Sequence, residues 1–527
     1  MTSTLPDELT PRVSCDLLRS LETRVNVPSD RESIAIIAPF TGQEIGSVPQ
    51  ATGEDVAAAA DAARIAQRQW NRLSIKTRVR TFTRFHDLLV DRADEAIDLV
   101  QLEAGKSRVP AFEEVFDVAG VTRYYFNIAP SALRRKRRSV SIPIVSKAYE
   151  YRHPVGVVGF IVPWNFPFTL GISDAIPALL AGNGVVIKPD EKTPYSTLYS
   201  VALLEEAGLP EGLIQVVTGD GEAVGRPLID SVDYVMFTGS TAVGRLVAEQ
   251  AAQRLIGSSL ELGGKNAALV LGDADLDSAV PGIARAFYAN GGQLCLSAER
   301  IYVVESVKDE FIRRYVDYVR DLSLTMAYDF SSDLSSLIDP QHLANVHAHV
   351  EDAVEKGAEI LIGGKPRPDV GPSFYEPTVL INVDETMDVC RTETFGPVVS
   401  IYGVPDTETA IARANDSEYG LNFSVWTRDA KRGIEVASRL QAGTVGVNDG
   451  YAAAWSTYDA PMGGFKQSGL SRRHGEIGIL KYTEAQTVAV QRWVPAFAPP
   501  AAGISYYTYH KVLVPALKLL RRLPFYK

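Results

Sequence analysis

Short apolar runs alternate with helical segments from residue 155 onward, and this alternation is the strongest constraint on the fold. The runs are VGVVGFIV (155–162), GVVIKP (184–189), LIQVVTG (213–219), DYVMFTGS (233–240) and SSLELGG (258–264). Helical patterns at 193–210 and 241–255 separate some of them. Strands that alternate with helices predict βαβ units and a parallel sheet, whose ligand site lies at the carboxyl ends of the strands. We therefore expect PWN, KPDE, TGDG, FTGS and ELGGK to share one rim.

A second α/β pattern follows, which predicts a second domain. Its apolar runs are KNAALVL (265–271), RIYVVES (300–306), FYEPTVL (374–380), PVVSIYGV (397–404) and GTVGVN (443–448), with a helix expected at 307–322. Residues 54–105 repeat apolar residues at helical spacing and predict helices packed on one side of a domain.

Composition excludes several classes of protein. The chain has 527 residues, of which 46% are hydrophobic and 22% charged, values typical of a globular protein with two large domains and an appendage. A net charge of -11 argues against general nucleic-acid binding. The N-terminus does not resemble a signal peptide, and no run approaches the ~18 apolar residues of a spanning helix. We expect a cytoplasmic protein.

The three cysteines, Cys15, Cys295 and Cys390, lie far apart in sequence. This spacing excludes a disulfide framework and a cysteine-based zinc cluster, and we expect no metal site. Cys295 stands out because it lies in the glycine-rich stretch ANGGQLCLS (289–297). A lone cysteine is more often a small buried hydrophobe, and a nucleophile on a tight loop is the alternative.

Glycines also mark two candidate phosphate-binding turns. No G-x-G-x-x-G fingerprint is present, but GDGEAVG (219–225) and FTGSTAVG (237–244) lie at expected strand-to-helix turns. Backbone N–H groups at such helix N-termini can bind a pyrophosphate. Each turn alone is a weak signal, since glycine turns are common in α/β proteins.

The combination of motifs is much more specific. PWNFP, KPDEKTP, FTGSTAVG, ELGGKN, GGQLC, ETFGPVV and PMGGFKQSGLSRRHG occur in this order. With them, the chain resembles the NAD(P)-dependent aldehyde dehydrogenase superfamily from near Pro39 to about Val494. The resemblance implies an α/β fold with a Rossmann-like cofactor domain (1–138 and 156–264), a catalytic domain (265–481) and a small oligomerisation β-sheet (139–155 and 482–502). It also implies a homodimer or homotetramer.

The resemblance assigns catalytic roles to three residues. Cys295 is the expected nucleophile, which attacks the aldehyde carbon. Glu261 is the expected general base for Cys295 or for the water that hydrolyses the thioester. Asn165 is expected to stabilise the oxyanion together with the backbone N–H of Cys295. The presence of Glu261 favours hydrolysis to the free acid over transfer to coenzyme A, which stays an alternative.

The resemblance also implies a nucleotide site. Lys188 and Glu191 are expected at the adenosine ribose, and a carboxylate there would repel the extra phosphate of NADP, so NAD is preferred to NADP. Glu393 and Phe395 are expected at the nicotinamide end. The remaining expected cofactor residues are Ile161, Trp164, Gly221, Gly225, Gly239 and Ser240.

The substrate is less constrained. The sequence looks most like a succinate-semialdehyde dehydrogenase-like branch, yet Ser173 and Ala289 occupy the positions where members of that group carry carboxylate-binding arginines. The expected tunnel is instead apolar, with Phe166, Leu170, Leu294, Leu296 and Met462. A carboxylate without a cationic partner would be costly there. An apolar or aromatic aldehyde is thus at least as plausible as succinic semialdehyde.

The C-terminal segment 503–527 is apolar and basic. It could dock onto its own or a neighbouring subunit, which we favour, or lie on a membrane surface. Pro515 is expected to interrupt a long helix there. A catalytically silent scaffold that uses this tail is the competing hypothesis for the whole chain, and retention of Cys295, Glu261 and Asn165 argues against it.

Overall fold

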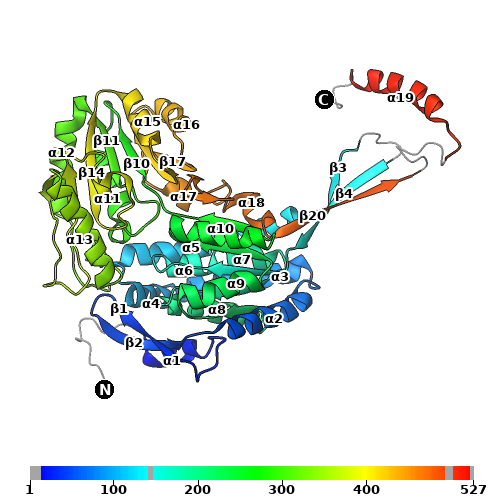
Figure 1. Ribbon diagram of the computed structural model, residues 1–527, viewed down its shortest axis with the longest axis horizontal. Coiled ribbons are helices and arrows are strands. Elements are labelled where there is room, and N and C mark those ends of the chain that lie inside the picture. Colours follow the sequence, from blue (N-terminus) through cyan, green and yellow to red (C-terminus); the bar gives the residue numbers. More distant parts are fainter. Residues whose placement is uncertain (1–12, 141–145, 493–501, 523–527) are drawn as a thin grey trace.

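A six-stranded sheet forms the centre of the first half of the molecule (Figure 1). The computed structural model describes residues 13–140, 146–492 and 502–522. The strand order is β19-β9-β8-β5-β6-β7, parallel except for β19. The bounds are β5 (Val157–Ile161), β6 (Gly184–Lys188), β7 (Ile214–Val216), β8 (Tyr234–Thr238), β9 (Gly257–Glu261) and β19 (Gly469–Leu470). The five predicted strands and the parallel sheet are therefore confirmed.

Helices cover both faces of this sheet, because its strands are apolar on both sides. Val157 and Val186 belong to the core under one face, and Val158 and Val185 belong to the core under the other. The first face carries α2 (Gly53–Trp70), α9 (Arg226–Ser231) and α10 (Thr241–Gln253). The other carries a thicker layer made of α3 (Ile75–Asp91), α4 (Ala93–Ala104), α5 (Arg108–Ala132), α6 (Pro167–Ile172), α7 (Ala175–Leu180) and α8 (Pro194–Glu206). At the edge lie α1 (Cys15–Glu22), β1 (Ser33–Ala38) and β2 (Gln43–Pro49).

The second half contains a seven-stranded sheet in the order β12-β13-β14-β11-β10-β16-β17. The strands are β10 (Ala267–Val270), β11 (Arg300–Val304), β12 (Glu359–Ile362), β13 (Thr378–Ile381), β14 (Val398–Val404), β16 (Asn422–Trp426) and β17 (Thr444–Val447). Packed around it are α11 (Leu276–Tyr288), α12 (Glu305–Arg320), α13 (Pro340–Glu355), α14 (Asp388–Arg391), α15 (Thr407–Asn415), α16 (Ala430–Ser438) and α17 (Ala452–Trp455). The short strands β15 (Tyr419–Gly420) and β18 (Phe465–Lys466) pair with each other, and α18 (Gly475–Leu480) packs on α5 and α7.

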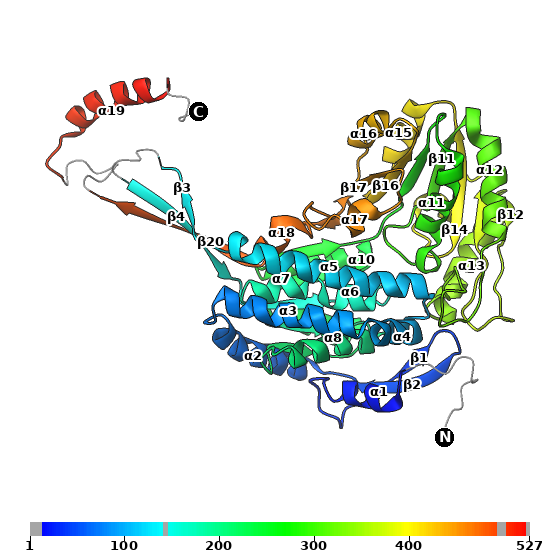
Figure 2. The same cartoon turned by 180° about the vertical axis from the view of Figure 1, so that it is seen from behind.

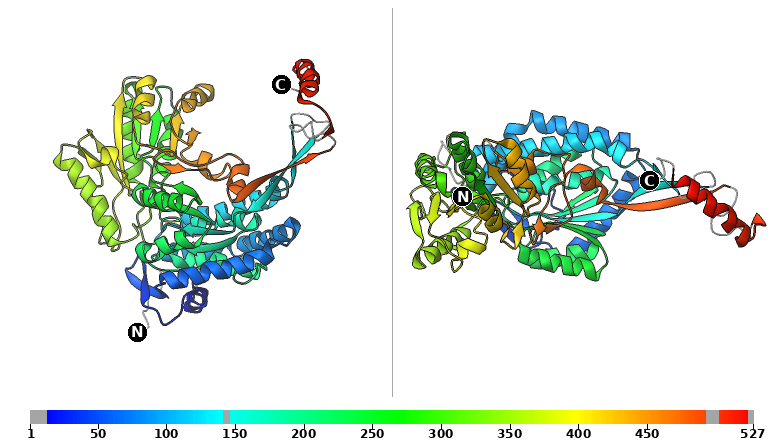
Figure 3. Two further views of the ribbon diagram at one scale, coloured as in Figure 1. Left: turned by 45° about the vertical axis from the view of Figure 1, so that its right-hand side comes forward. Right: turned by 90° about the horizontal axis from the view of Figure 1, so that it is seen from above.

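A three-stranded antiparallel sheet projects from the body (Figures 1 and 2). β20 (Thr483–Gln491) pairs with β4 (Ser146–Pro154) along its whole length, and β3 (Lys136–Arg138) pairs with the other edge of β4. The predicted small sheet is present, and its role in assembly stays a prediction. Figure 3 shows that the C-terminal helix lies at its far end.

That C-terminal helix, α19 (Tyr506–Leu520), continues through Pro515, so the expected interruption is wrong. Proline keeps a helical φ, and what it removes is one backbone N–H bond. Because Pro515 is exposed, water can reach the carbonyl that loses this bond. None of the described residues of α19 is buried, and residues 523–527 of the tail lie outside the described residues. No helix in the described part of the chain is long and apolar enough to cross a membrane.

A buried ion pair fixes the start of α6, which follows the PWN motif directly. Lys106 Nζ lies 2.6 Å from Glu114 Oε1, and both side chains are fully buried. The other oxygen, Glu114 Oε2, accepts hydrogen bonds from the backbone N–H groups of Phe168 and Thr169, each at 2.9 Å. Removing one partner of such a pair costs roughly 3–5 kcal/mol. The clamp therefore holds the loop that carries Asn165 against α5.

Candidate active site

The predicted rim residues meet where the strand order of the first sheet reverses. The PWN motif follows β5, and the TGS motif begins at Thr238, the last residue of the neighbouring strand β8. Strand β9 ends at Glu261, and β6 ends at Lys188. A crevice at such a reversal is the usual ligand site of an open α/β sheet. A cavity of about 260 Å³ lies there, lined by Pro163, Trp164, Asn165, Thr238, Gly239, Ser240, Glu261, Leu262, Gly263, Cys295, Glu393 and Phe395. The structure thus brings the three expected catalytic residues together.

Cys295 follows a tight left-handed turn at the end of α11. Asn290, Gly291 and Gly292 have φ values of 52°, 63° and 76°. At Gly292, a Cβ atom would lie 2.2 Å from the carbonyl oxygen of Gly396. Glycine is required there both by its backbone conformation and by the close contact with the ETFGP motif. The GG pair therefore shapes the loop that displays the thiol.

Hydrogen bonds tie this loop to the PWN loop. Asn165 Nδ2 donates to the carbonyl oxygen of Gln293 at 3.1 Å, and Asn290 Nδ2 donates to the carbonyl oxygen of Asn165 at 3.0 Å. Asn266 Nδ2 donates to the carbonyl oxygen of Cys295 at 2.7 Å. An amide carries two N–H groups, so Asn165 retains one donor for a ligand in the cavity.

The site places a weakly acidic thiol beside a carboxylate that can act as a base. Burial, helped by the charges of Glu393 and Glu261, raises the pKa of Cys295 to about 12. Burial also raises the pKa of Glu261 to about 7, although Arg473 and Lys481 oppose this shift. A carboxylate with a pKa near neutral is suited to accept a proton from a thiol or a water molecule.

The ETFGP loop is held in place by Glu299, which belongs to none of the sequence motifs, and by Glu393 within the loop itself. Glu299 accepts hydrogen bonds from the backbone N–H groups of Thr394 and Phe395, and its other partner is the buried ammonium of Lys265. Glu393 accepts a hydrogen bond from the Gly264 N–H at 2.8 Å, and burial raises its pKa to about 8. No sequence motif identifies Glu299, because its role appears only once the strands are paired.

Aromatic contacts connect both sides of the cavity. The Trp164 ring packs edge-on against Phe395, with centroids 5.6 Å apart. Ser240 ends the turn after β8, and its hydroxyl accepts from the Val243 N–H at the start of α10. Ile161, the half-buried last residue of β5, lies just before the PWN loop. These positions surround the crevice where a dinucleotide would lie.

The two turns expected to meet phosphate differ. Gly221 and Gly225 lie in a single π-helical turn (Gly221–Gly225) after β7, and they are not among the residues that line the cavity above. Asp220 already accepts hydrogen bonds from the backbone N–H groups of Glu222 and Ala223. An anion at this turn would compete with that carboxylate, whereas Gly239 and Ser240 border the cavity directly.

At the carboxyl end of β6, Lys188 Nζ lies 3.2 Å from Glu191 Oε2. The Lys188 side chain is buried and Glu191 is half-buried. Between them lies the half-buried Asp190, and desolvation together with the charge of Glu191 raises its pKa to about 6. This end of the crevice therefore carries one buried cation and two carboxylates.

The expected tunnel residues lie in one apolar cluster. Phe166, Leu170, Leu294, Leu296 and Met462 are all buried in the same core, and Cys295 packs against it. Phe166 packs on the Trp455 ring, with centroids 5.3 Å apart. The thiol thus borders an apolar region on the side away from the rim.

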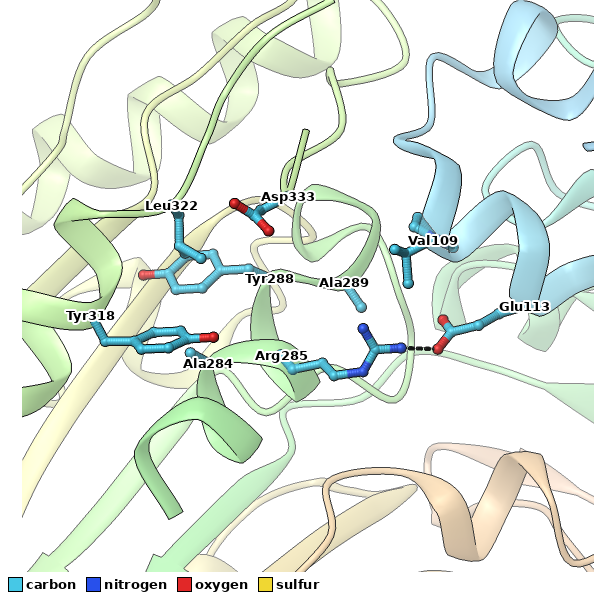
Figure 4. A pocket seen from close by; sticks show the side chains of 10 residues that line it. Val109, Glu113, Ala284, Arg285, Tyr288, Ala289, Tyr318, Leu322 and Asp333 are labelled. Carbon is cyan, nitrogen blue, oxygen red and sulfur yellow. Dashed lines mark hydrogen bonds and ion pairs between the residues drawn. The ribbon is translucent and has the colours of Figure 1, made fainter. Parts of the chain in front are cut away.

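At Ser173 and Ala289, the two positions that lack the expected arginine, the contacts described here leave no cation free to bind a substrate carboxylate. The Ser173 hydroxyl lies 3.2 Å from Asp117 Oδ2, so an acid faces this position. Ala289 lines a separate cavity of about 120 Å³, shown in Figure 4. Arg285 reaches into it but pairs with Glu113, which also accepts a hydrogen bond from the Tyr451 hydroxyl at 3.2 Å. Sequence reasoning missed Asp117, Glu113 and Arg285, since only the folded chain brings α5 and α11 together.

Comparison with known proteins identifies the class of enzyme. The model of the aldehyde dehydrogenase family matches residues 26–488. The chain belongs to this family and is an NAD(P)-dependent oxidoreductase that acts on aldehydes. Family membership supports aldehyde oxidation and not the silent-scaffold hypothesis.

Individual relatives are similar over nearly their whole length. A Mycolicibacterium smegmatis protein named "Putative succinate-semialdehyde dehydrogenase [NADP(+)]" is 50% identical over 94% of this chain and 95% of its own. A crystal structure of succinate-semialdehyde dehydrogenase from Burkholderia pseudomallei has a TM-score of 0.83 at 34% identity, covering 87% of this chain and 95% of that one. Betaine aldehyde dehydrogenase from Staphylococcus aureus, in complex with NAD+, has a TM-score of 0.85 at 31% identity, covering 91% and 98%.

The turn before Cys295 generates a prediction. Gly292→Ala should lower kcat/KM by about 100-fold, because displacing a reacting group by about 1 Å can cost that much. Gly53→Ala is the matched control, since its added Cβ would meet only Pro227 at 3.4 Å. Steady-state kinetics of both variants check this, and equal activities would contradict the proposed constraint.

Proposed function

We propose that the enzyme oxidises an aldehyde to the free carboxylic acid through a covalent intermediate on Cys295. The observation that carries the proposal is that Cys295, Glu261 and Asn165 line one cavity at the sheet's ligand-binding edge. In the first step, Glu261 accepts the thiol proton and Cys295 Sγ bonds to the aldehyde carbon. The Asn165 amide and the Cys295 backbone N–H donate to the oxygen that becomes negative.

The residues present fit a dinucleotide. The crevice has a basic group in Lys188 at one end and the paired rings of Trp164 and Phe395 at the other. When bound, the nicotinamide cofactor supplies the acceptor for the hydride that leaves the former aldehyde carbon, so that a thioester remains. Glu261 releases the proton from Cys295 to solvent before hydrolysis and then takes a proton from water, whose oxygen attacks the thioester carbon. The acid leaves, and Cys295 Sγ takes that proton from Glu261, so that the thiol and the carboxylate are both restored.

Two variants test the steps. Glu261→Gln should slow the release of the first equivalent of NADH and should also slow later turnover strongly, because the amide can accept a proton neither from the thiol nor from water. Cys295→Ala should give neither burst nor turnover, while Cys390→Ala, at a buried free cysteine that does not line the cavity, should behave as wild type. Stopped-flow NADH absorbance measures the burst, and normal turnover by Cys295→Ala would refute the covalent route.

For the substrate, we favour an apolar or aromatic aldehyde. Asp117 beside Ser173, and Glu113 beside Arg285, place carboxylates where an acidic substrate would need free cations. A carboxylate is costly to bury without a partner. Succinic semialdehyde is the second candidate, supported by the names of the relatives and by Arg285 beside Ala289 (Figure 4).

Adding the missing cation tests this choice. Ala289→Arg should raise kcat/KM for succinic semialdehyde relative to benzaldehyde by about tenfold, or ~1.4 kcal/mol. Ser278→Arg, at an exposed position on α11, the helix that ends just before Ala289, should change neither value. A wild type that prefers succinic semialdehyde and loses this preference in Arg285→Met would reject the apolar assignment and make Arg285 the anchor.

For the cofactor, we favour NAD over NADP. In this proposal Glu191 and the half-buried Asp190 face the adenosine ribose, where a 2′-phosphate would add two negative charges. Glu191 is already paired with the Lys188 ammonium, which is therefore not free to bind phosphate. The name of the M. smegmatis relative points to NADP, and the S. aureus structure holds NAD+.

Removing that carboxylate should change the preference. Glu191→Ser should raise the ratio of kcat/KM for NADP to that for NAD by about tenfold, because Lys188 becomes free to pair with phosphate. Glu222→Ser removes an exposed acid elsewhere and should leave the ratio unchanged. Steady-state kinetics with both nucleotides decide, and a wild type that prefers NADP would overturn the repulsion argument.

We further propose a cytoplasmic homo-oligomer, dimer or tetramer, in which the projecting sheet and α19 contact a neighbouring subunit. All but the first residue of β20 are exposed, and α19 exposes Tyr507, Val512 and Leu519. Contact with a neighbouring subunit would cover these exposed apolar side chains. Since α19 lies away from the main body, a neighbouring subunit suits it better than its own (Figures 1 and 2).

Deleting residues 503–527 should reduce the mass measured by light scattering in solution without abolishing the NADH burst. Val243→Ser, a change of an exposed apolar residue on α10, serves as the control. Unchanged mass would reject the subunit contact, and loss of binding to anionic lipid vesicles would assign the tail to a membrane surface instead.

A further inference from the structure

The carboxylate of Glu261 lies in an unusual setting. Only 4% of the residue is exposed, and neither carboxylate oxygen has a hydrogen-bond partner among the described residues. A buried carboxylate without hydrogen bonds is strongly destabilised in its charged form. A general base must nevertheless be ionised to accept a proton, so other charges have to stabilise it.

Two buried cations lie on the side of Glu261 away from the cysteine loop. Lys481 Nζ contacts the Ser259 hydroxyl at 3.1 Å, and Ser259 is two residues before Glu261 on the same face of β9. Arg473 follows β19, which pairs with β9 at Glu261 itself. Both cations are paired with Asp174, at 2.9 Å from Arg473 Nε and 3.7 Å from Lys481 Nζ.

The charges of this cluster do not balance. Its buried acids are Glu261, Asp174 and Asp117, and its buried cations are Arg473 and Lys481. Together, Arg473 and Lys481 lower the pKa of Asp174, although burial opposes this. Burial raises the pKa of Asp117 to about 7, close to that of Glu261. Arg473 opposes the effect of burial at both acids, so Asp117 and Glu261 share this cation.

The other titratable groups around Glu261 add little charge. Burial and the neighbouring Arg473 lower the pKa of His474 to about 3, so it is neutral. Burial keeps the Tyr125, Tyr234 and Tyr482 hydroxyls protonated by raising their pKa. On the cavity side, Cys295 and Glu393 have raised pKa values for the same reason, and the half-buried Arg472 adds a weaker positive charge.

We infer that Arg473, Lys481 and Asp174 are positioning residues which set the protonation of Glu261, with Asp117 as its competitor for the Arg473 cation. This inference rests on the proposed role of Glu261 as the base for hydrolysis. None of the four residues needs to touch the substrate. They act through charge, so each removal shifts the pH at which Glu261 ionises in a direction fixed by the sign of the charge removed.

The test is the pH profile of deacylation. An activated acetate ester such as p-nitrophenyl acetate acylates Cys295 without a cofactor, so its steady hydrolysis reports the deacylation step. Because Glu261 acts when ionised, the rate should rise with pH through its pKa. Lys481→Met should move this rise to higher pH by about one unit, and Asp174→Asn and Asp117→Asn should move it to lower pH by a similar amount.

Asp459→Asn is the control, since this exposed acid contacts Tyr124 and not the cluster. Arg473→Lys keeps the charge and should keep the wild-type profile, and thermal unfolding of every variant reports folding. If one variant does not fold, the two remaining charge removals still give a decision. Lower rates without a shift, or shifts in the same direction for Lys481→Met and Asp174→Asn, would overturn the inference. Failure of the proposed function is distinguishable, because Glu261→Gln would then deacylate normally.

Discussion

The contact between the turn at Gly292 and the carbonyl oxygen of Gly396 is the constraint on which the site depends. With no room for a Cβ, two loops from the second half of the chain interlock directly. One displays Cys295 and the other carries Glu393 and Phe395. Asn165 is hydrogen-bonded to the same turn. The loop at the carboxyl edge of the first sheet is therefore held in a fixed position relative to Cys295, the proposed nucleophile. A single backbone contact thus aligns groups that lie more than a hundred residues apart.

Desolvation gives this alignment its chemical use. The cavity that lets a thiol meet an aldehyde away from bulk water also raises the pKa values of Cys295, Glu261 and Glu393. If the pKa of the general base were far above neutral, the base would stay protonated and could not accept a proton. If its pKa were far below neutral, the ionised carboxylate would be too weak a base to take one. The buried cations Arg473 and Lys481 oppose the effect of burial at Glu261, so its pKa stays near neutral instead of rising further. The positions of Arg473 and Lys481 therefore keep Glu261 able to ionise, which burial alone would prevent.

Sequence predicted the elements better than their interlocking. Apolar runs such as GVVIK are buried on both faces and identify parallel strands by themselves. The strand pattern predicted Asn165 and Glu261 on one edge, and the family resemblance added Cys295 from the second domain. β16, in contrast, was not predicted, because NFSVW contains Asn422 and Ser424, which are buried only through partners elsewhere in the fold. Gly221 and Gly225 looked like a phosphate turn, yet Asp220 satisfies that turn's own N–H groups. Local patterns cannot show which donors are already used.

The residues that we propose to set substrate specificity could not be predicted from the sequence either. Ser173 and Ala289 could be noted as missing arginines, but the acids opposite them, Asp117 and Glu113, belong to α5, more than fifty residues away. Losing a cation would leave a neutral wall, whereas an ionised Asp117 beside Ser173 disfavours an anion, since like charges repel most strongly where water is excluded. At Ala289 the charge of Glu113 is offset by its ion pair with Arg285. Whether the site merely fails to bind an anionic substrate or disfavours it therefore depends on the packing of α5 against α6 and α11. It does not depend on Ser173 or Ala289 alone.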